Sequence, residues 1–213
     1  MRITTGQRRA LVLILLLASF CWTGVTQAME YRLSLQDGVA VSNINYDPDI
    51  PTDWYKNGFF GIAWEAKQEA SSFSFDIELN HVTKGSSFFE LNQDKVDKYR
   101  YLELPVFVRY YPVERHRFTV YAELGASAAV NLSADQLVGT GAAAVKTPIS
   151  TAKKFGFGLQ AGVGTEFWFK PTFALFFSTR YAHGLTWVDD ANATFNHGKL
   201  RAFELFIGPK IKL

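Results

Sequence analysis

Residues 99–112 read YRYLELPVFVRYYP and carry the clearest pattern in the chain. Residue character alternates with a period of two, which indicates a β-strand with two unlike faces. One face holds Leu102, Leu104, Val106, Val108 and Tyr110, and the other holds Tyr101, Glu103, Pro105, Phe107 and Arg109. Globular strands are usually about five or six residues long, whereas a tilted strand that crosses a bilayer needs about nine to eleven. Pattern and length together predict a membrane-spanning strand.

The chain begins with MRITTGQRRALVLILLLASFCWTGVTQA, in which three arginines precede an apolar run and a series of small residues. This order predicts a secretory signal peptide over residues 1–28, too short in its apolar run for a helical membrane span. Residues 29–213 then form one domain by size. Cys21 would leave with the peptide, so the mature chain would have no cysteine for disulfides, thiol catalysis or thiolate–metal bonds.

Composition favours a β-rich protein that does not bind nucleic acid. Aromatic residues make up 15% of the chain, with 19 Phe and 16 Gly against only two Met. The formal net charge is +2, and no basic run suggests a nucleic-acid partner. After residue 28 no stretch is apolar enough for a helical membrane span, so any spanning element has to be a strand.

Alternation predicts eight strands, at about residues 31–42, 58–68, 73–80, 99–112, 118–131, 154–169, 173–182 and 200–213. The connections after the first, third, fifth and seventh strands are long, and those after the second, fourth and sixth are short. We interpret residues 83–98 and 132–153 as long loops. Outer-membrane barrels alternate in this way because tight turns lie at the periplasmic end and long loops at the extracellular end.

The alternative is a soluble, lipocalin-like barrel with an apolar inside. The more polar face is crowded with Gly, Ala and Ser between isolated charges, which suits a narrow filled interior better than a solvated surface. The other face offers Phe, Leu, Val and Ile in nearly every strand, more than a small ligand cavity needs. We therefore predict an all-β fold, a closed eight-stranded antiparallel transmembrane β-barrel in the bacterial outer membrane with both termini periplasmic.

Several blocks support a family resemblance. YLELPVFVRYYP, TVYAELGASAAVNLSA, FGFGLQAGVGTEFWF and FSTRYAHGLTWV follow one another before a closing strand, and over residues 99–213 this order resembles the PorT-like outer-membrane β-barrel family. The Tyr-Leu-Glu-Leu-Pro block and the block from Arg180 to Thr186 are the most specific parts. The resemblance implies location and architecture, and it implies an association with protein secretion for the member after which the family is named.

Twelve charged residues fall on the inward face by this alternation. In a barrel of eight strands, side chains fill the interior, so these groups have to pair with one another or with trapped water. We predict a structural charge network in which Arg180 serves several carboxylates; a proton or ion path is the alternative. The set is Arg32, Glu65, Lys67, Asp76, Glu78, Glu103, Arg109, Glu123, Glu166, Arg180, Glu204 and Lys210.

No catalytic, metal or cofactor site is expected. His81 and His183 fall on the lipid-facing parity of strands on opposite sides of the barrel, and Ser178 points inward, so no acyl-transfer triad is assembled. The four histidines are too scattered for a metal site. We therefore expect a non-enzymatic barrel in contact with outer-membrane lipid, with a structural or surface-interaction role through its extracellular loops. An accessory component of a secretion system, with envelope or secretion proteins as partners, and a narrow pore are the alternatives.

Overall fold

The computed structural model describes residues 28–47, 51–90, 93–139, 144–188 and 197–213. The predicted signal peptide, residues 1–28, lies outside this part of the chain except for Ala28. No helix within these ranges is long and apolar enough to span a membrane.

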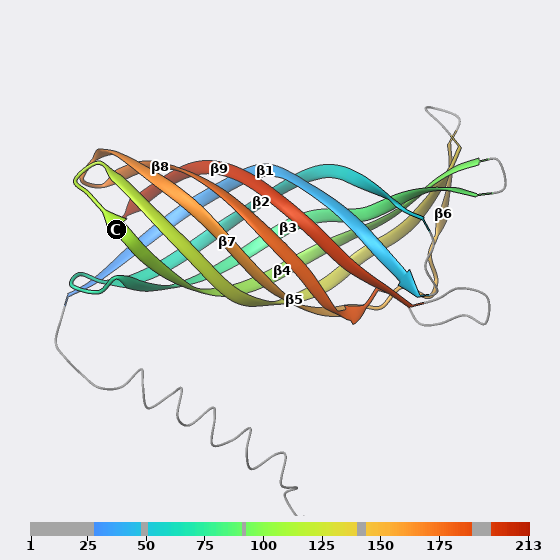
Figure 1. Cartoon of the computed structure of the whole chain (residues 1–213), viewed down its shortest axis with the longest axis horizontal. Helices are drawn as coiled ribbons and strands as arrows, with labels where there is room; N and C mark the ends of the chain where they lie inside the picture. Colours follow the sequence, from blue (N-terminus) through green and yellow to red (C-terminus); the bar gives the residue numbers. More distant parts are fainter. Residues whose placement is uncertain (1–27, 48–50, 91–92, 140–143, 189–196) are drawn as a thin grey trace, which may run out of the picture.

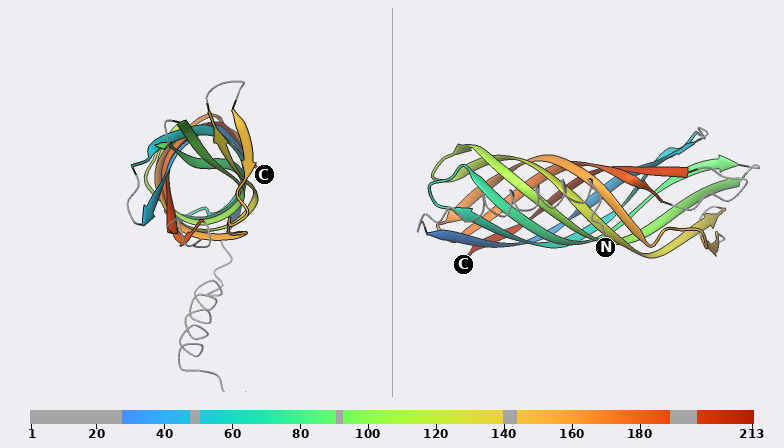
Figure 2. Two further views of the ribbon diagram at one scale, coloured as in Figure 1. Left: turned by 90° about the vertical axis from the view of Figure 1, so that its right-hand side faces the viewer. Right: turned by 90° about the horizontal axis from the view of Figure 1, so that it is seen from below.

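The described residues form one antiparallel sheet that closes on itself (Figure 1). Neighbours along the sheet run β4-β3-β2-β1-β9-β8-β7-β5, and pairing of β4 with β5 completes the ring. The view along the axis shows the ring directly (Figure 2, left). The strands are β1 (Met29–Asp47), β2 (Asp53–Gln68), β3 (Phe73–Glu90), β4 (Gln93–Glu114), β5 (Phe118–Val138), β6 (Val145–Pro148), β7 (Phe155–Lys170), β8 (Phe173–Trp187) and β9 (His197–Lys212). With β6 as a short addition to β5, the predicted closed eight-stranded barrel is confirmed within this part of the chain.

The two faces of β4 show why the sequence forms this wall. Glu103, Phe107 and Arg109 are buried inside the barrel, whereas Leu104 and Val108 are 48% and 42% exposed on its outer face. A closed ring leaves no edge with unpaired backbone groups, so the apolar outer face can lie in hydrocarbon without exposing backbone N–H or C=O groups. The barrel is therefore inverted relative to a soluble protein, with its charge inside and its apolar side chains outside.

The barrel has two unlike ends. At one end, called here the short-turn end, residues 69–72, 115–117 and 171–172 connect neighbouring strands. The backbone N–H of Leu213 donates to the carbonyl of Tyr31 at 2.9 Å, so the chain end and the start of β1 both lie there. The opposite end, called the hairpin end, carries the extensions of β3, β4, β5 and β6 (Figure 1, right).

The interpretation of residues 83–98 and 132–153 as loops is wrong for much of both segments. β3 and β4 stay paired up to Glu90 and Gln93, and β5 continues to Val138, where it pairs with Val145 of β6. Gly139 follows with a φ of 98°, a left-handed conformation that suits glycine at the end of a strand. These extensions do not alternate between apolar and polar because neither face lies against lipid, and backbone pairing alone defines the strands.

Two aromatic residues expected at the membrane interface are interior residues instead. Tyr111 is 3% exposed, and its hydroxyl donates to Glu65. The indole N–H of Trp168 donates to Glu166 at 3.2 Å. Both positions follow the period of two, since each comes directly after or before a residue on the outer face.

Candidate functional site

Arg180 on β8 lies at the centre of a cluster of buried ions. Its Nη1 and Nη2 lie 2.9 Å from the two carboxylate oxygens of Glu78 on β3, and its Nε lies 2.9 Å from Glu123 Oε1 on β5. A third carboxylate, that of Glu204, lies 3.9 Å from Nη1. Because the planar guanidinium has five donors, one arginine can join carboxylates from several strands.

A second arginine, Arg109 on β4, shares two of these carboxylates. Its Nε lies 2.8 Å from Glu123 Oε2, and its Nη2 lies 3.1 Å from Glu78 Oε1. Its Nη1 contacts Asp76 and lies 3.4 Å from Glu65 Oε2. The two arginines therefore form a continuous layer of charge across the barrel.

The network continues towards the short-turn end. Lys210 Nζ lies 2.8 Å from Glu65 Oε2 and also contacts Glu166. Arg32 Nη1 lies 3.4 Å from Glu166 Oε2. Lys67 is buried, but its ion-pair partner is Glu114 at the mouth of the barrel rather than a carboxylate of the central layer. All twelve residues of the inward set are thus buried, between 0% and 5% exposed.

Lys84 belongs to this interior although the sequence placed it in a loop. It is 2% exposed, and its Nζ lies 2.7 Å from Glu103 Oε1 and 2.8 Å from Glu204 Oε1. Its inward position raises the number of inward bases from five to six, against seven acids. The signal was present, because Lys84 continues the even-numbered parity of Glu78 and Asn80, but the polar residues around it hid the pattern.

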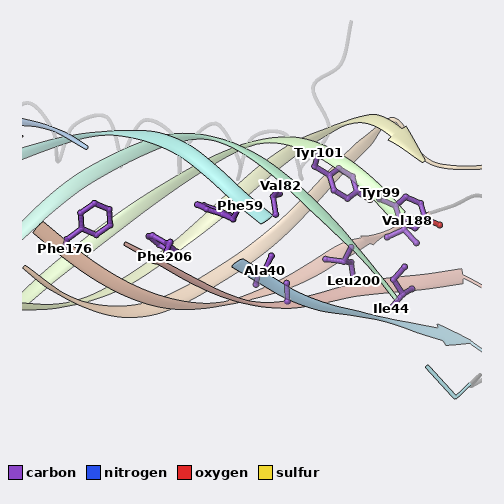
Figure 3. Close-up of a cluster of buried hydrophobic side chains, with 12 residues drawn as sticks. Ala40, Ile44, Phe59, Val82, Tyr99, Tyr101, Phe176, Val188, Leu200 and Phe206 are labelled. Carbon is purple, nitrogen blue, oxygen red and sulfur yellow. The ribbon is translucent and has the colours of Figure 1, made fainter. Parts of the chain in front are cut away.

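Apolar side chains fill the interior beside and beyond the ions (Figure 3). Phe59 and Phe206 stack with ring centroids 5.1 Å apart. The guanidinium carbon of Arg180 lies 4.7 Å from the centroid of the Phe206 ring, which joins this cluster to the charged layer. The cluster continues to the hairpin end through Ala40, Ile44, Val82, Tyr99, Tyr101, Phe176, Ala182, Val188, Leu200 and Ala202.

The two lipid-facing histidines lie on opposite sides of the barrel. His81 on β3 pairs with Phe60 and Leu102, whereas His183 on β8 pairs with Leu159 and Arg201, and four strand steps separate β3 from β8. Ser178 is buried and donates to the carbonyl of Val163. Within the described ranges no three His, Cys, Asp or Glu side chains are arranged to hold a metal ion.

The hairpin end presents exposed apolar side chains and a depression. Phe89 at the end of β3 is 68% exposed, and Val145 on β6 is 64% exposed. Between the β3–β4 and β5–β6 hairpins lies a depression of about 470 Å³, lined among others by Phe88, Val96 and Leu137. These extensions have no counterpart at the short-turn end among the described residues (Figure 1).

Comparisons with known proteins agree with this architecture. Residues 38–190 match the outer membrane protein beta-barrel domain family. OprG from Pseudomonas aeruginosa is 12% identical, with a TM-score of 0.52 over 89% of this chain and 99% of the other. Neisserial surface protein A is 15% identical, with a TM-score of 0.45 over 85% and 97% of the two chains. No curated protein matches the sequence. At these identities the likeness to OprG shows the fold alone.

Proposed function

Because the chain belongs to the outer membrane protein beta-barrel domain family, we propose that it is a non-catalytic integral protein of the bacterial outer membrane that binds a partner through its hairpin end. The hairpin end faces the outside of the cell, and the short-turn end with both termini faces the periplasm. This orientation follows the usual arrangement of such barrels, in which short turns are periplasmic.

The length of β4 supports a working surface beyond the membrane. The strand has 22 residues, about twice the number needed to cross a bilayer. Its exposed apolar side chains lie between Leu102 and Val113, so residues 93–101 extend past this apolar band. In this orientation, about half of β4 holds a hairpin outside the lipid.

The observation that carries the proposal is the exposure of Phe89 and Val145 on these extensions. Lipid covers the outer face of the barrel, but it does not reach hairpins that extend into water. Exposed apolar residues around a depression on a water-facing surface mark an interaction site. The filled interior argues in the same direction, because ion pairs and aromatic rings occupy the space that a channel would need.

Photo-crosslinking in the native membrane tests this proposal. A photoreactive phenylalanine analogue replaces Phe89, and a matched variant carries it at Arg115 in a short turn. We expect discrete crosslinked products from position 89 that position 115 does not give. Equal product patterns at both positions, or products with lipid alone, would contradict a partner-binding hairpin end.

The identity of the products separates two roles. The resemblance to the PorT-like family favours an accessory role in protein secretion, and secretion proteins among the products would support it. A surface-interaction role would instead give extracellular or cell-surface partners. A narrow pore is tested separately by conductance in planar bilayers, where we expect little or none.

A further inference from the structure

The backbone ladder between β7 and β8 is interrupted near the hairpin end. The last paired residues are Gly158 and Gly184, and the next backbone contact runs from the N–H of Lys153 to the carbonyl of Val188 at 2.9 Å. Between these points the backbone N–H of Phe157 donates to the hydroxyl of Thr186 at 3.0 Å. The neighbouring β8–β9 pairing also shifts register beyond His183.

A narrow slot occupies this interruption and connects the two faces of the wall. Its volume is about 50 Å³. Its lining includes Phe157, Leu159 and His183 on the outer face and Lys84, Glu103 and Gln160 on the inner face. Phe157 and Leu159 are 58% and 48% exposed, so the outer mouth lies among side chains that would contact lipid. One water-sized group needs about 10–15 Å³, so the slot has room for a few such groups in a row.

Gln160 gives this slot a specific chemical feature. The side chain is 2% exposed, and within the described residues its Oε1 has no hydrogen-bond partner. A buried amide oxygen without a donor is costly, and native structures almost always satisfy such an atom. The ammonium of Lys84 is not its donor, because it already contacts Glu103 and Glu204.

We propose that the slot between β7 and β8 binds an unbranched alkyl chain that carries a hydroxyl group, entering from the lipid-facing side and donating its hydroxyl hydrogen to Gln160 Oε1. The apolar mouth suits the alkyl part, and the slot is too narrow for a ring or a branched group. The ion pair of Lys84 with Glu103 ends the slot on the inner side. This site is separate from the partner-binding surface at the hairpin end, so either proposal can fail without the other.

Titration followed by NMR tests the site on the full barrel refolded in lipid nanodiscs. The probes are 1-decanol and, as a matched molecule without a donor, n-decane, both added as mole fractions of the lipid. We expect 1-decanol to shift the amide signals of Gly156 and Gly158 and the side-chain amide of Gln160 in a saturable way. One neutral hydrogen bond corresponds to an affinity about fivefold higher for 1-decanol than for n-decane.

Two variants and a control assign the effect to the slot. Gln160→Leu should reduce the preference for 1-decanol to less than about twofold, because it removes the acceptor. Gly156→Leu should abolish saturable binding of both probes. A Cβ at Gly156 would lie 3.5 Å from Thr186 Oγ1 and 3.7 Å from Ala129 Cβ, so the wall accepts it and the longer side chain fills the slot. Gly58→Leu, where a Cβ meets no atom within 4 Å, should bind like the unmodified protein.

Several results would overturn the proposal. These are shifts that do not saturate, equal affinities for the two probes in the unmodified protein, and unchanged binding in Gly156→Leu. A water molecule that stays in contact with the Gln160 side chain at saturating 1-decanol, detected by nuclear Overhauser effects, would show that the slot holds water only.

Discussion

The interior of this barrel is filled in two different ways along its axis. Around Arg109 and Arg180 the strands meet through ion pairs between elements far apart in the sequence, whereas around Val82 and Ile44 they meet through apolar packing. The same alternation places both sets inside. The difference teaches that a narrow barrel requires its interior to be filled, and that the filling can be ionic or apolar. The two fillings should respond differently to substitution, because a buried charge needs its partner and a buried methyl group needs only volume.

Arg180→Ala should have the largest effect. It leaves Glu78 and Glu123 without the cation they share, and breaking a buried ion pair on one side costs about 3–5 kcal/mol. We expect the free energy of unfolding to fall by about 4 kcal/mol. Urea titration in lipid vesicles measures it, together with the heat-dependent gel shift of the folded barrel. Unchanged gel mobility and heat unfolding would refute the central role of Arg180.

Val82→Ala should have an intermediate effect in the apolar region. Val82 is 0% exposed, and losing two methyl groups from a packed site costs about 2 kcal/mol once the cavity is included. The matched control is Val145→Ala on the exposed β6, for which we expect a change within about 0.5 kcal/mol. The same urea titration measures both. Equal losses for the two valines would mean that the apolar cluster does not stabilise the barrel.

Arg100→Ala should have the smallest effect and should separate exposed from buried charge. Arg100 has a side chain that is 48% exposed and lies 3.5 Å from Asp135. Exposed pairs contribute about 0–1 kcal/mol, and salt at about 1 M screens most of that. We therefore expect a small loss in dilute buffer that disappears at high salt, while the loss in Arg180→Ala persists. A salt-dependent loss in Arg180→Ala would mean that water reaches the central ion layer.

The sequence predicted which residues face inward better than it predicted where strands end. Alternation within the membrane is enforced by lipid on one side and a narrow interior on the other, so a period of two identifies the face of each charged residue. At the hairpin end neither constraint applies, and the extended β3–β4 hairpin and β6 were missed. Lys84 was missed for the same reason, because it lies where the alternating pattern gives way to polar residues.

The sequence by itself determined the class of the protein: a chain of amphipathic strands, each with an apolar face for lipid, that has to close because unpaired backbone is not tolerated in hydrocarbon. The tertiary structure decided which charges meet. Parity assigns a side chain to a face, but register, tilt and closure set the distance between residues as far apart as Glu78 and Arg180. The interruption between β7 and β8 and the unpartnered oxygen of Gln160 likewise appear only in three dimensions, because they depend on which backbone groups pair across neighbouring strands.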